Sequence, residues 1–107
     1  MTTALPAPVQ TVIDAANKND SDAFLDVFTQ EGVVDDWGRE FRGRAAIKDW
    51  SDKEFIGVHV SLKVTEVAER AGEWTVTATV GGDGFNGPSH FMFRVDGSQV
   101  ARMTIRE

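Results

Sequence analysis

The apolar residues of this chain change their spacing once, near Gly57, and that change constrains the fold more than any other feature. After Gly57, apolar and polar residues alternate as they do in half-buried strands. Before it, apolar residues recur at the i, i+3, i+4, i+7 spacing of one helix face, first at Val9, Val12, Ile13 and Ala16. Helices followed by a run of strands predict an α+β domain.

Three helices are predicted in the first half of the chain. The first begins at Pro6 and Pro8, because a missing backbone N–H costs little in the first turn of a helix. The second follows a polar segment that offers several N-caps and ends at Gly32, and the third covers residues 43–50. The side chains expected to be buried on the second and third helices are Phe24, Val27, Phe28, Ala46, Ile47 and Trp50.

A short strand is predicted at residues 33–37, followed by a turn or loop at residues 38–42. Four longer strands then form a meander. The first of them alternates from Val58 to Val64, and a slip before Val67 predicts a β-bulge. The other three are expected at residues 74–80, 90–95 and 100–105.

The composition excludes several classes of function. A chain of 107 residues is expected to form one domain, residues 1–107, with residues 1–5 as a loose leader. The net charge of −6 argues against nucleic acid or an anionic membrane surface as the main partner, because both would repel it. No cysteine is present, so thiolate chemistry is excluded. Neither a signal peptide nor a membrane span is recognisable, and a cytoplasmic protein is expected.

Several segments carry a family resemblance through their order along the chain: "NDSDAFLDVF", "EGVVDDWGREFRGRAAIKDW", "GDGFNGP", "FMFRVDG" and "QVARMTI". From about Val9 to Ile105 the chain resembles the nuclear transport factor 2-like superfamily, and most closely its small SnoaL-like members. The superfamily includes ketosteroid isomerases, scytalone dehydratases, limonene epoxide hydrolases and polyketide cyclases.

The resemblance implies a cystatin-like α+β cone, in which three N-terminal helices pack in the concave face of a curved, mostly antiparallel sheet. A cavity would open at one end of this cone. The resemblance also implies a homodimer that pairs through the outer face of the sheet. Apolar residues on both faces of one strand, with Met92 opposite Phe91 and Phe93, fit such a covered outer face.

Asp36 is the candidate general base. In ketosteroid isomerases the base lies in a stretch like "VVDDWG", and the resemblance places it on Asp36. A carboxylate in an apolar cavity is desolvated, which raises its pKa and makes it a better proton acceptor. Asp35 is expected to point to the opposite face and to be solvated, because neighbours on a strand alternate. The alternative for Asp36 is a strand-end carboxylate paired with Arg39, Arg42 or Arg44.

The chain departs from the ketosteroid isomerase pattern at two positions. Ketosteroid isomerase, an example of pKa tuning in general accounts of catalysis, has an oxyanion hole made of a tyrosine and a protonated aspartate. The matching positions here are Val12 and Phe91, and the chain contains no tyrosine. Without donors for a developing oxyanion, enolisation loses several kcal/mol of transition-state stabilisation. This departure argues against ketosteroid isomerase activity.

The two histidines are weaker candidates. Simple alternation places His59 on the outer face, whereas the family comparison places it inward near Asp36 if a bulge falls early. His90 is expected on the outer face. No ligand spacing suggests a metal, and "GGDGFNG" lacks the lysine of a phosphate loop, so neither a metal nor a cofactor is predicted.

The aromatic residues either line a pocket for a flat hydrophobic ligand or fill the cone, and we expect a small pocket that is partly filled. Its expected lining is Val12, Phe28, Trp37, Trp50, Trp74 and Phe91. One hypothesis is an isomerase, cyclase or hydrolase that acts on a small hydrophobic ligand with Asp36 as base. The alternative is a non-catalytic ligand-binding or dimerisation domain whose cavity is largely filled by aromatics. A weaker third reading is an accessory domain for a protein partner.

Overall fold

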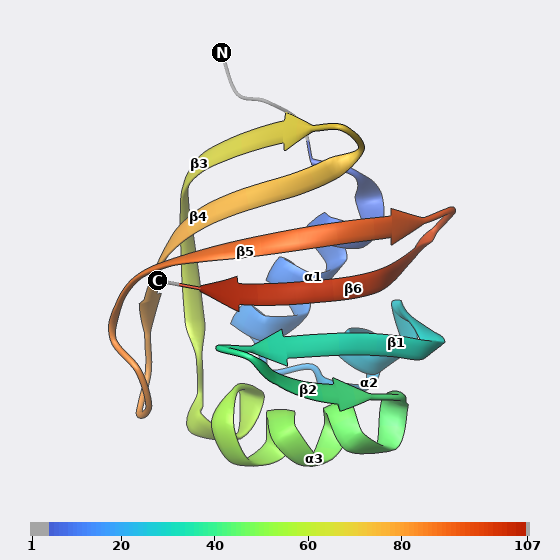
Figure 1. Ribbon diagram of the computed structural model, residues 1–107. Coiled ribbons are helices and arrows are strands. Elements are labelled where there is room, and N and C mark those ends of the chain that lie inside the picture. Colours follow the sequence, from blue (N-terminus) through green and yellow to red (C-terminus); the bar gives the residue numbers. More distant parts are fainter. Residues whose placement is uncertain (1–4, 107) are drawn as a thin grey trace.

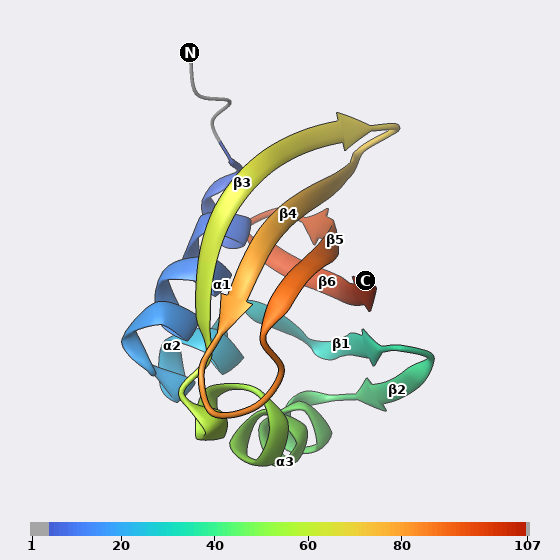
Figure 2. The ribbon, with the colours of Figure 1, turned by 90° about the vertical axis from the view of Figure 1, so that its left-hand side faces the viewer.

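A curved six-stranded sheet carries three helices against one face in the computed structural model, which describes residues 5–106 (Figures 1 and 2). The strand order is β2-β1-β6-β5-β4-β3, and only the β1–β6 pair is parallel. The helices are α1 (Ala7–Lys18), α2 (Ser21–Asp26), α3 (Arg44–Glu54) and the 3-10 turn η1 (Ile56–Val58). The strands are β1 (Phe28–Asp36), β2 (Arg39–Arg42), β3 (Ser61–Arg70), β4 (Glu73–Gly81), β5 (Gly87–Asp96) and β6 (Gln99–Arg106). The predicted α+β class is confirmed.

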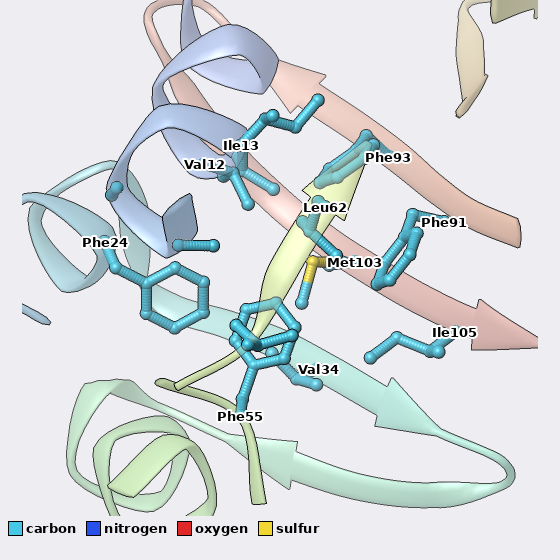
Figure 3. Close-up of a cluster of buried hydrophobic side chains, with 14 of the residues drawn as sticks. Val12, Ile13, Phe24, Val34, Phe55, Leu62, Phe91, Phe93, Met103 and Ile105 are labelled. Carbon is cyan, nitrogen blue, oxygen red and sulfur yellow. The ribbon is translucent and has the colours of Figure 1, made fainter. Parts of the chain in front are cut away.

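The core lies between the helices and the concave face of the sheet (Figure 3). The four apolar residues that predicted α1 are all buried along one side of that helix. From α2 and α3, Phe24 and Ile47 are fully buried. On the sheet side the strands contribute every second residue, including Val76, Phe93 and Met103. The predicted leader is only partly described: residues 1–4 lie outside the described range, and Leu5 packs against this core.

The second predicted helix is shorter than expected. α2 begins at its N-cap Asp20, whose side chain accepts a hydrogen bond from the Ala23 backbone N–H, and it ends at Asp26. Phe28 is the first residue of β1, where it pairs with Val100 of β6. The Val100 N–H donates to the Val27 carbonyl at 2.7 Å. The helix therefore ends before Val27, because the residues that follow pair with a distant strand instead.

Residues 38–42 are not the predicted loop, because β2 pairs with β1 as a hairpin. Trp37 and Gly38 form its two-residue turn, with φ of 56° and 90°. Positive φ at both central positions is the signature of a type I′ turn, which matches the twist of the flanking strands. The Gly38 N–H also donates to Asp35 Oδ1 at 2.8 Å. Trp37 is therefore a turn residue and not the end of a strand.

The long strands follow the predicted alternation. The register between β3 and β4 shifts between Val64 and Glu66, which confirms the predicted bulge. β3 starts later than predicted, at Ser61, because η1 occupies Ile56–Val58 and the chain then turns at His59, whose φ is 54°.

Candidate functional site

A pocket of about 560 Å³ opens at the end of the sheet where β1 ends and β5 begins. Its walls come from the β1–β2 turn, the C-terminal half of α3, η1, the β4–β5 loop and the inner face of β4, β5 and β6. The lining residues are Asp36, Trp37, Arg39, Trp50, Lys53, Glu54, Phe55, Val58, Val60, Val80, Gly81, Gly84, Phe85, Ser89, Phe91 and Ile105. Most of these side chains are apolar, and the ionisable ones come from the β1–β2 hairpin and α3.

Asp36 is the last residue of β1 and lies on the inner face beside Ile105 of β6. Its side chain is 15% exposed. One carboxylate oxygen, Oδ2, accepts hydrogen bonds from Trp50 Nε1 at 3.0 Å and from Arg39 Nη2 at 2.6 Å. Within residues 5–106 no donor binds the other oxygen, Oδ1. Asp36 thus lines the pocket and is also paired with Arg39, so features of both alternatives occur together.

Arg39 joins β2 to the C-terminal end of α3. Its guanidinium donates to both oxygens of Glu54, at 2.7 and 3.1 Å, and lies 5.6 Å from the centre of the Phe41 ring. The guanidinium lowers the pKa of Glu54. In turn the two carboxylates raise the pKa of Arg39 further above its ordinary value, and the effect of Glu54 is larger than that of Asp36. Because the Arg39 side chain is 54% exposed, this network adds little to stability but fixes the charge beside Asp36.

The aromatic residues form a stack along one side of the pocket. Trp50 stacks on Phe55 with ring centres 5.1 Å apart and on Phe41 at 6.0 Å. Phe55 in turn contacts Phe91 at 6.4 Å. Trp37, from the β1–β2 turn, and Phe85, from the β4–β5 loop, also line the pocket, and each is about half exposed. These two exposed aromatics come from opposite sides of the pocket.

Three of the predicted lining residues, Trp37, Trp50 and Phe91, line the pocket, and the other three do not. Val12 and Phe28 are fully buried in the core, because α1 and the start of β1 pack tightly against the sheet. Trp74 lies near the other end of β4, opposite Phe93 of β5. Sequence reasoning missed Ile105, although it lies at an inward position of a predicted strand, and Ser89, which lies in β5 just before the predicted start of that strand at residue 90. Phe85 carried no periodic signal.

His59 does not point toward Asp36. It is not in a strand, and its side chain is 71% exposed, with Nδ1 2.9 Å from Asp83 Oδ2 on the neighbouring loop. The left-handed turn after η1 directs it away from the pocket, so its candidacy as a catalytic group fails. His90 is exposed on the outer face, as predicted, and contacts the Thr77 hydroxyl.

Asp35 is buried, contrary to the expectation that it is solvated. It lies on the outer face and is 7% exposed because two arginines of β6 cover it. Arg106 contacts both of its oxygens, at 3.0 and 3.2 Å, and Arg102 contacts Oδ2 at 2.8 Å. These contacts, with that of Arg106 the largest, lower the pKa of Asp35 despite its burial. Asp35 is a structural anion that stabilises the β1–β6 pair.

Within residues 5–106 there is no group of three or more side chains with the geometry to hold a metal ion. In the same part of the chain, every helix is too short or too polar to cross a membrane.

Several solved structures have this architecture. A proposed polyketide cyclase from Sinorhizobium meliloti is 27% identical, with 95% of each chain covered and a TM-score of 0.83. A hypothetical protein from Catenulispora acidiphila with a ketosteroid isomerase-like fold, solved with trimethylamine, is 21% identical; the match covers 97% of this chain and 87% of that one, with a TM-score of 0.80. An uncharacterised cystatin-fold protein from Novosphingobium aromaticivorans is 10% identical over 99% of this chain and all of its own, with a TM-score of 0.82.

Among curated proteins, none matches the chain significantly. The family model of the SnoaL-like domain matches residues 9–103, which span the fold from α1 to β6. The chain therefore belongs to the SnoaL-like domain family, within the nuclear transport factor 2-like superfamily.

Proposed function

We propose that the pocket binds a small, largely apolar molecule and that Asp36 acts on it as a general base. The observation that carries this proposal is a carboxylate in the wall of an otherwise mostly apolar pocket, with one oxygen held and the other open to a ligand. Two hydrogen bonds to Oδ2 orient the group, and Oδ1 keeps its lone pairs for a proton. A positioned base of this kind typically contributes a rate factor of about 10² to 10⁴.

The size and walls of the pocket favour a flat hydrophobic ligand. Its volume of about 560 Å³ lies within the range of small-molecule sites. The rings of Trp50, Phe55 and Phe91 provide an aromatic wall. The reaction class we propose is that of an isomerase, cyclase or hydrolase, in which Oδ1 takes a proton from carbon or from water. The proposed cyclase role of the Sinorhizobium meliloti relative is consistent with this class.

A second candidate, a non-catalytic ligand-binding domain, is favoured by the Arg39 contact. A guanidinium lies 2.6 Å from Oδ2, so the Asp36 carboxylate already has an ion-pair partner within the protein. In addition, the positions of the two oxyanion donors of ketosteroid isomerases hold Val12, which is buried in the core away from the pocket, and Phe91. Under this candidate the pocket binds its ligand without turnover.

Binding and proton transfer are tested with one probe, 2-tetralone, a bicyclic ketone with acidic α-protons. Thermal unfolding is expected to shift upward when 2-tetralone is added. Exchange of its α-protons in D₂O, followed by proton NMR, is expected to be faster with the protein than in buffer. Asp36→Asn should reduce the protein-catalysed exchange at least tenfold. Asp49→Asn, which removes an exposed carboxylate of α3, is the matched control and should leave exchange unchanged.

The outcomes separate the candidates. Binding by the wild type without any exchange above buffer supports the non-catalytic candidate. Equal exchange in wild type and Asp36→Asn contradicts the role of Asp36. The absence of both binding and exchange counts against a ligand function for the pocket.

We also propose that two copies pair through the outer face of the sheet. Short or apolar side chains on adjacent strands are half-buried there: Thr75, Thr77, Met92 and Thr104. Light scattering is expected to give the mass of a dimer, and Met92→Glu to shift it to that of a monomer. A wild-type monomer at micromolar concentration contradicts this pairing.

A further inference from the structure

Ser89 places a hydroxyl group within the apolar part of the pocket. It is 3% exposed and lies on the inner face of β5, two residues before Phe91. Its cross-strand neighbour is Ala78 of β4, which has a short side chain. Ser89 is a lining residue of the same pocket as Asp36.

The hydroxyl of Ser89 has no hydrogen-bond partner within residues 5–106, although the residue is almost entirely buried. In the same part of the chain, no fully enclosed side-chain oxygen or nitrogen lacks a partner. The Ser89 oxygen is therefore in contact with the open space of the pocket. Because the described part of the chain provides no partner for this hydroxyl, a ligand oxygen at this position would form a hydrogen bond with it.

Ser51 shows the contrast. It is also buried, at 1% exposed, but it lies on α3 and its hydroxyl oxygen accepts a hydrogen bond from the Ile56 backbone N–H at 3.4 Å. It does not line the pocket. The Ser51 hydroxyl is thus hydrogen-bonded within the protein, whereas the Ser89 hydroxyl is available to a ligand in the pocket.

Ser89 and Asp36 lie on different strands, β5 and β1, with β6 between them. Phe91 is level with Asp36 through Ile105, and Ser89 lies two residues further along β5. Two strand spacings and two residue rises separate the backbones of Asp36 and Ser89 by about 12 Å, which a molecule of two or three fused rings with a hydrogen bond at each end can span. The lining between them is apolar and includes Phe91 and Ile105. A ligand that fills this space can therefore contact both polar groups only if it carries a polar atom near each end.

We propose that Ser89 is a specificity residue that binds a hydroxyl or carbonyl oxygen at the end of the ligand remote from Asp36. The ligand class is then a fused-ring or similarly flat hydrophobic compound with oxygen functions at both ends. This inference rests on the proposed ligand function of the pocket and adds the second polar contact to it.

The test compares two probes of nearly equal shape, 2,6-dihydroxynaphthalene and 6-methyl-2-naphthol, which differ by a hydroxyl or a methyl group at one end. Dissociation constants are measured by NMR titration for wild type, Ser89→Ala and Ser51→Ala, with thermal unfolding to show that each variant folds. The ratio of the two dissociation constants, methyl compound over diol, is expected to fall about fivefold in Ser89→Ala, the effect of losing one neutral hydrogen bond. It should be unchanged in Ser51→Ala.

A ratio that is the same in all three proteins, with both probes bound, overturns the role of Ser89 and leaves the ligand function of the pocket intact. If the wild type binds neither probe, the inference fails together with the proposed function. If Ser51→Ala lowers the ratio as much as Ser89→Ala does, the effect is one of general packing and the specific contact is refuted. Ser89→Cys provides a further check, since a weak S–H donor of similar size should give an intermediate ratio.

Discussion

The indole Nε1–H of Trp50 donates to Asp36 Oδ2 at 3.0 Å and so links α3 to the end of β1. This contact orients the candidate base from the helix side, while Arg39 approaches the same oxygen from the β2 side. Both donors come from elements that follow β1 in the chain, so the geometry of Asp36 depends on how α3 and the hairpin pack together.

Replacing Trp50 with phenylalanine should keep the aromatic stack but remove that hydrogen bond. Because Trp50 is 3% exposed and its donor reaches a carboxylate, we expect the free energy of unfolding to fall by about 1.5–3 kcal/mol. Urea unfolding measures this value. Trp74→Phe, which changes a tryptophan away from the pocket, serves as the control for loss of indole area, and an equal effect in both variants would contradict a specific role for the Trp50 contact.

Removing the charge of Arg39, as in Arg39→Met, should change the pKa of Glu54 clearly but the free energy of unfolding only slightly. The guanidinium lowers the pKa of Glu54, because a nearby positive charge favours the ionised acid. In Arg39→Met the pKa of Glu54 should therefore rise toward its ordinary value of 4.5, as measured by carboxyl NMR titration. The loss of unfolding free energy should stay below about 1 kcal/mol, since the pair is exposed. An unchanged Glu54 titration would show that the ion pair does not persist in solution.

The stabilising effect of Asp35 should be lost in acid, so the free energy of unfolding should fall there. Its pKa in the folded state lies below the ordinary value of 3.8, so the folded protein binds this proton less readily than the unfolded chain does. The stabilisation is complete well above pH 4 and is lost as the pH falls through the folded-state pKa. Asp35→Asn should cost roughly 1–3 kcal/mol at pH 7, because it leaves Arg102 and Arg106 without their buried partner.

The unfolding free energy of Asp35→Asn should also vary less with pH below about pH 5 than that of the wild type. Asp49→Asn is again the matched control, since its carboxylate is exposed beside Lys53, and it should retain the wild-type acid limb. Parallel acid limbs in wild type and Asp35→Asn would refute the assignment.

Trp37 occupies a turn position that favours other residues. At a φ of 56° in a type I′ turn, asparagine is preferred before glycine, and the Trp37 side chain is 53% exposed. Trp37→Asn should therefore leave thermal stability unchanged or raise it, while weakening the binding of 2-tetralone, because the side chain lines the pocket. A variant with lower stability and undiminished binding would show that Trp37 serves the fold rather than the pocket.

Local patterns in the sequence were sufficient for the elements whose residues alternate or recur regularly. The four spaced apolar residues predicted α1, and the alternation along β4 and β5 predicted which residues lie on the inner face. The bulge in β3 was predicted from one slip in that alternation. In each case the pattern arises within a single element, where the period of the backbone decides which side chains share a face.

The site was predicted less completely than the fold, because its residues come from segments far apart in the chain. The family resemblance made Asp36 a candidate base and Trp50 was an expected pocket residue, but their mutual contact depends on the packing of α3. Ser89 lies in β5 before the predicted start of that strand at residue 90, and nothing in the sequence indicates that its hydroxyl is left without a partner. Alternation that begins at Val58 predicts a strand at His59, whereas η1 and a left-handed turn precede β3.

What the sequence alone determined is the α+β class, the helical face of α1 and the inner face of the long strands, since these follow from short-range periodicity. The tertiary structure decided the rest. Pairing with β6 drew Phe28 into β1 and brought Arg102 and Arg106 over Asp35, which buried an acid that alternation alone had assigned to solvent. Strand pairing across about 70 residues of chain leaves no periodic trace in either segment, because its contacts depend on distance in space and not on spacing along the chain.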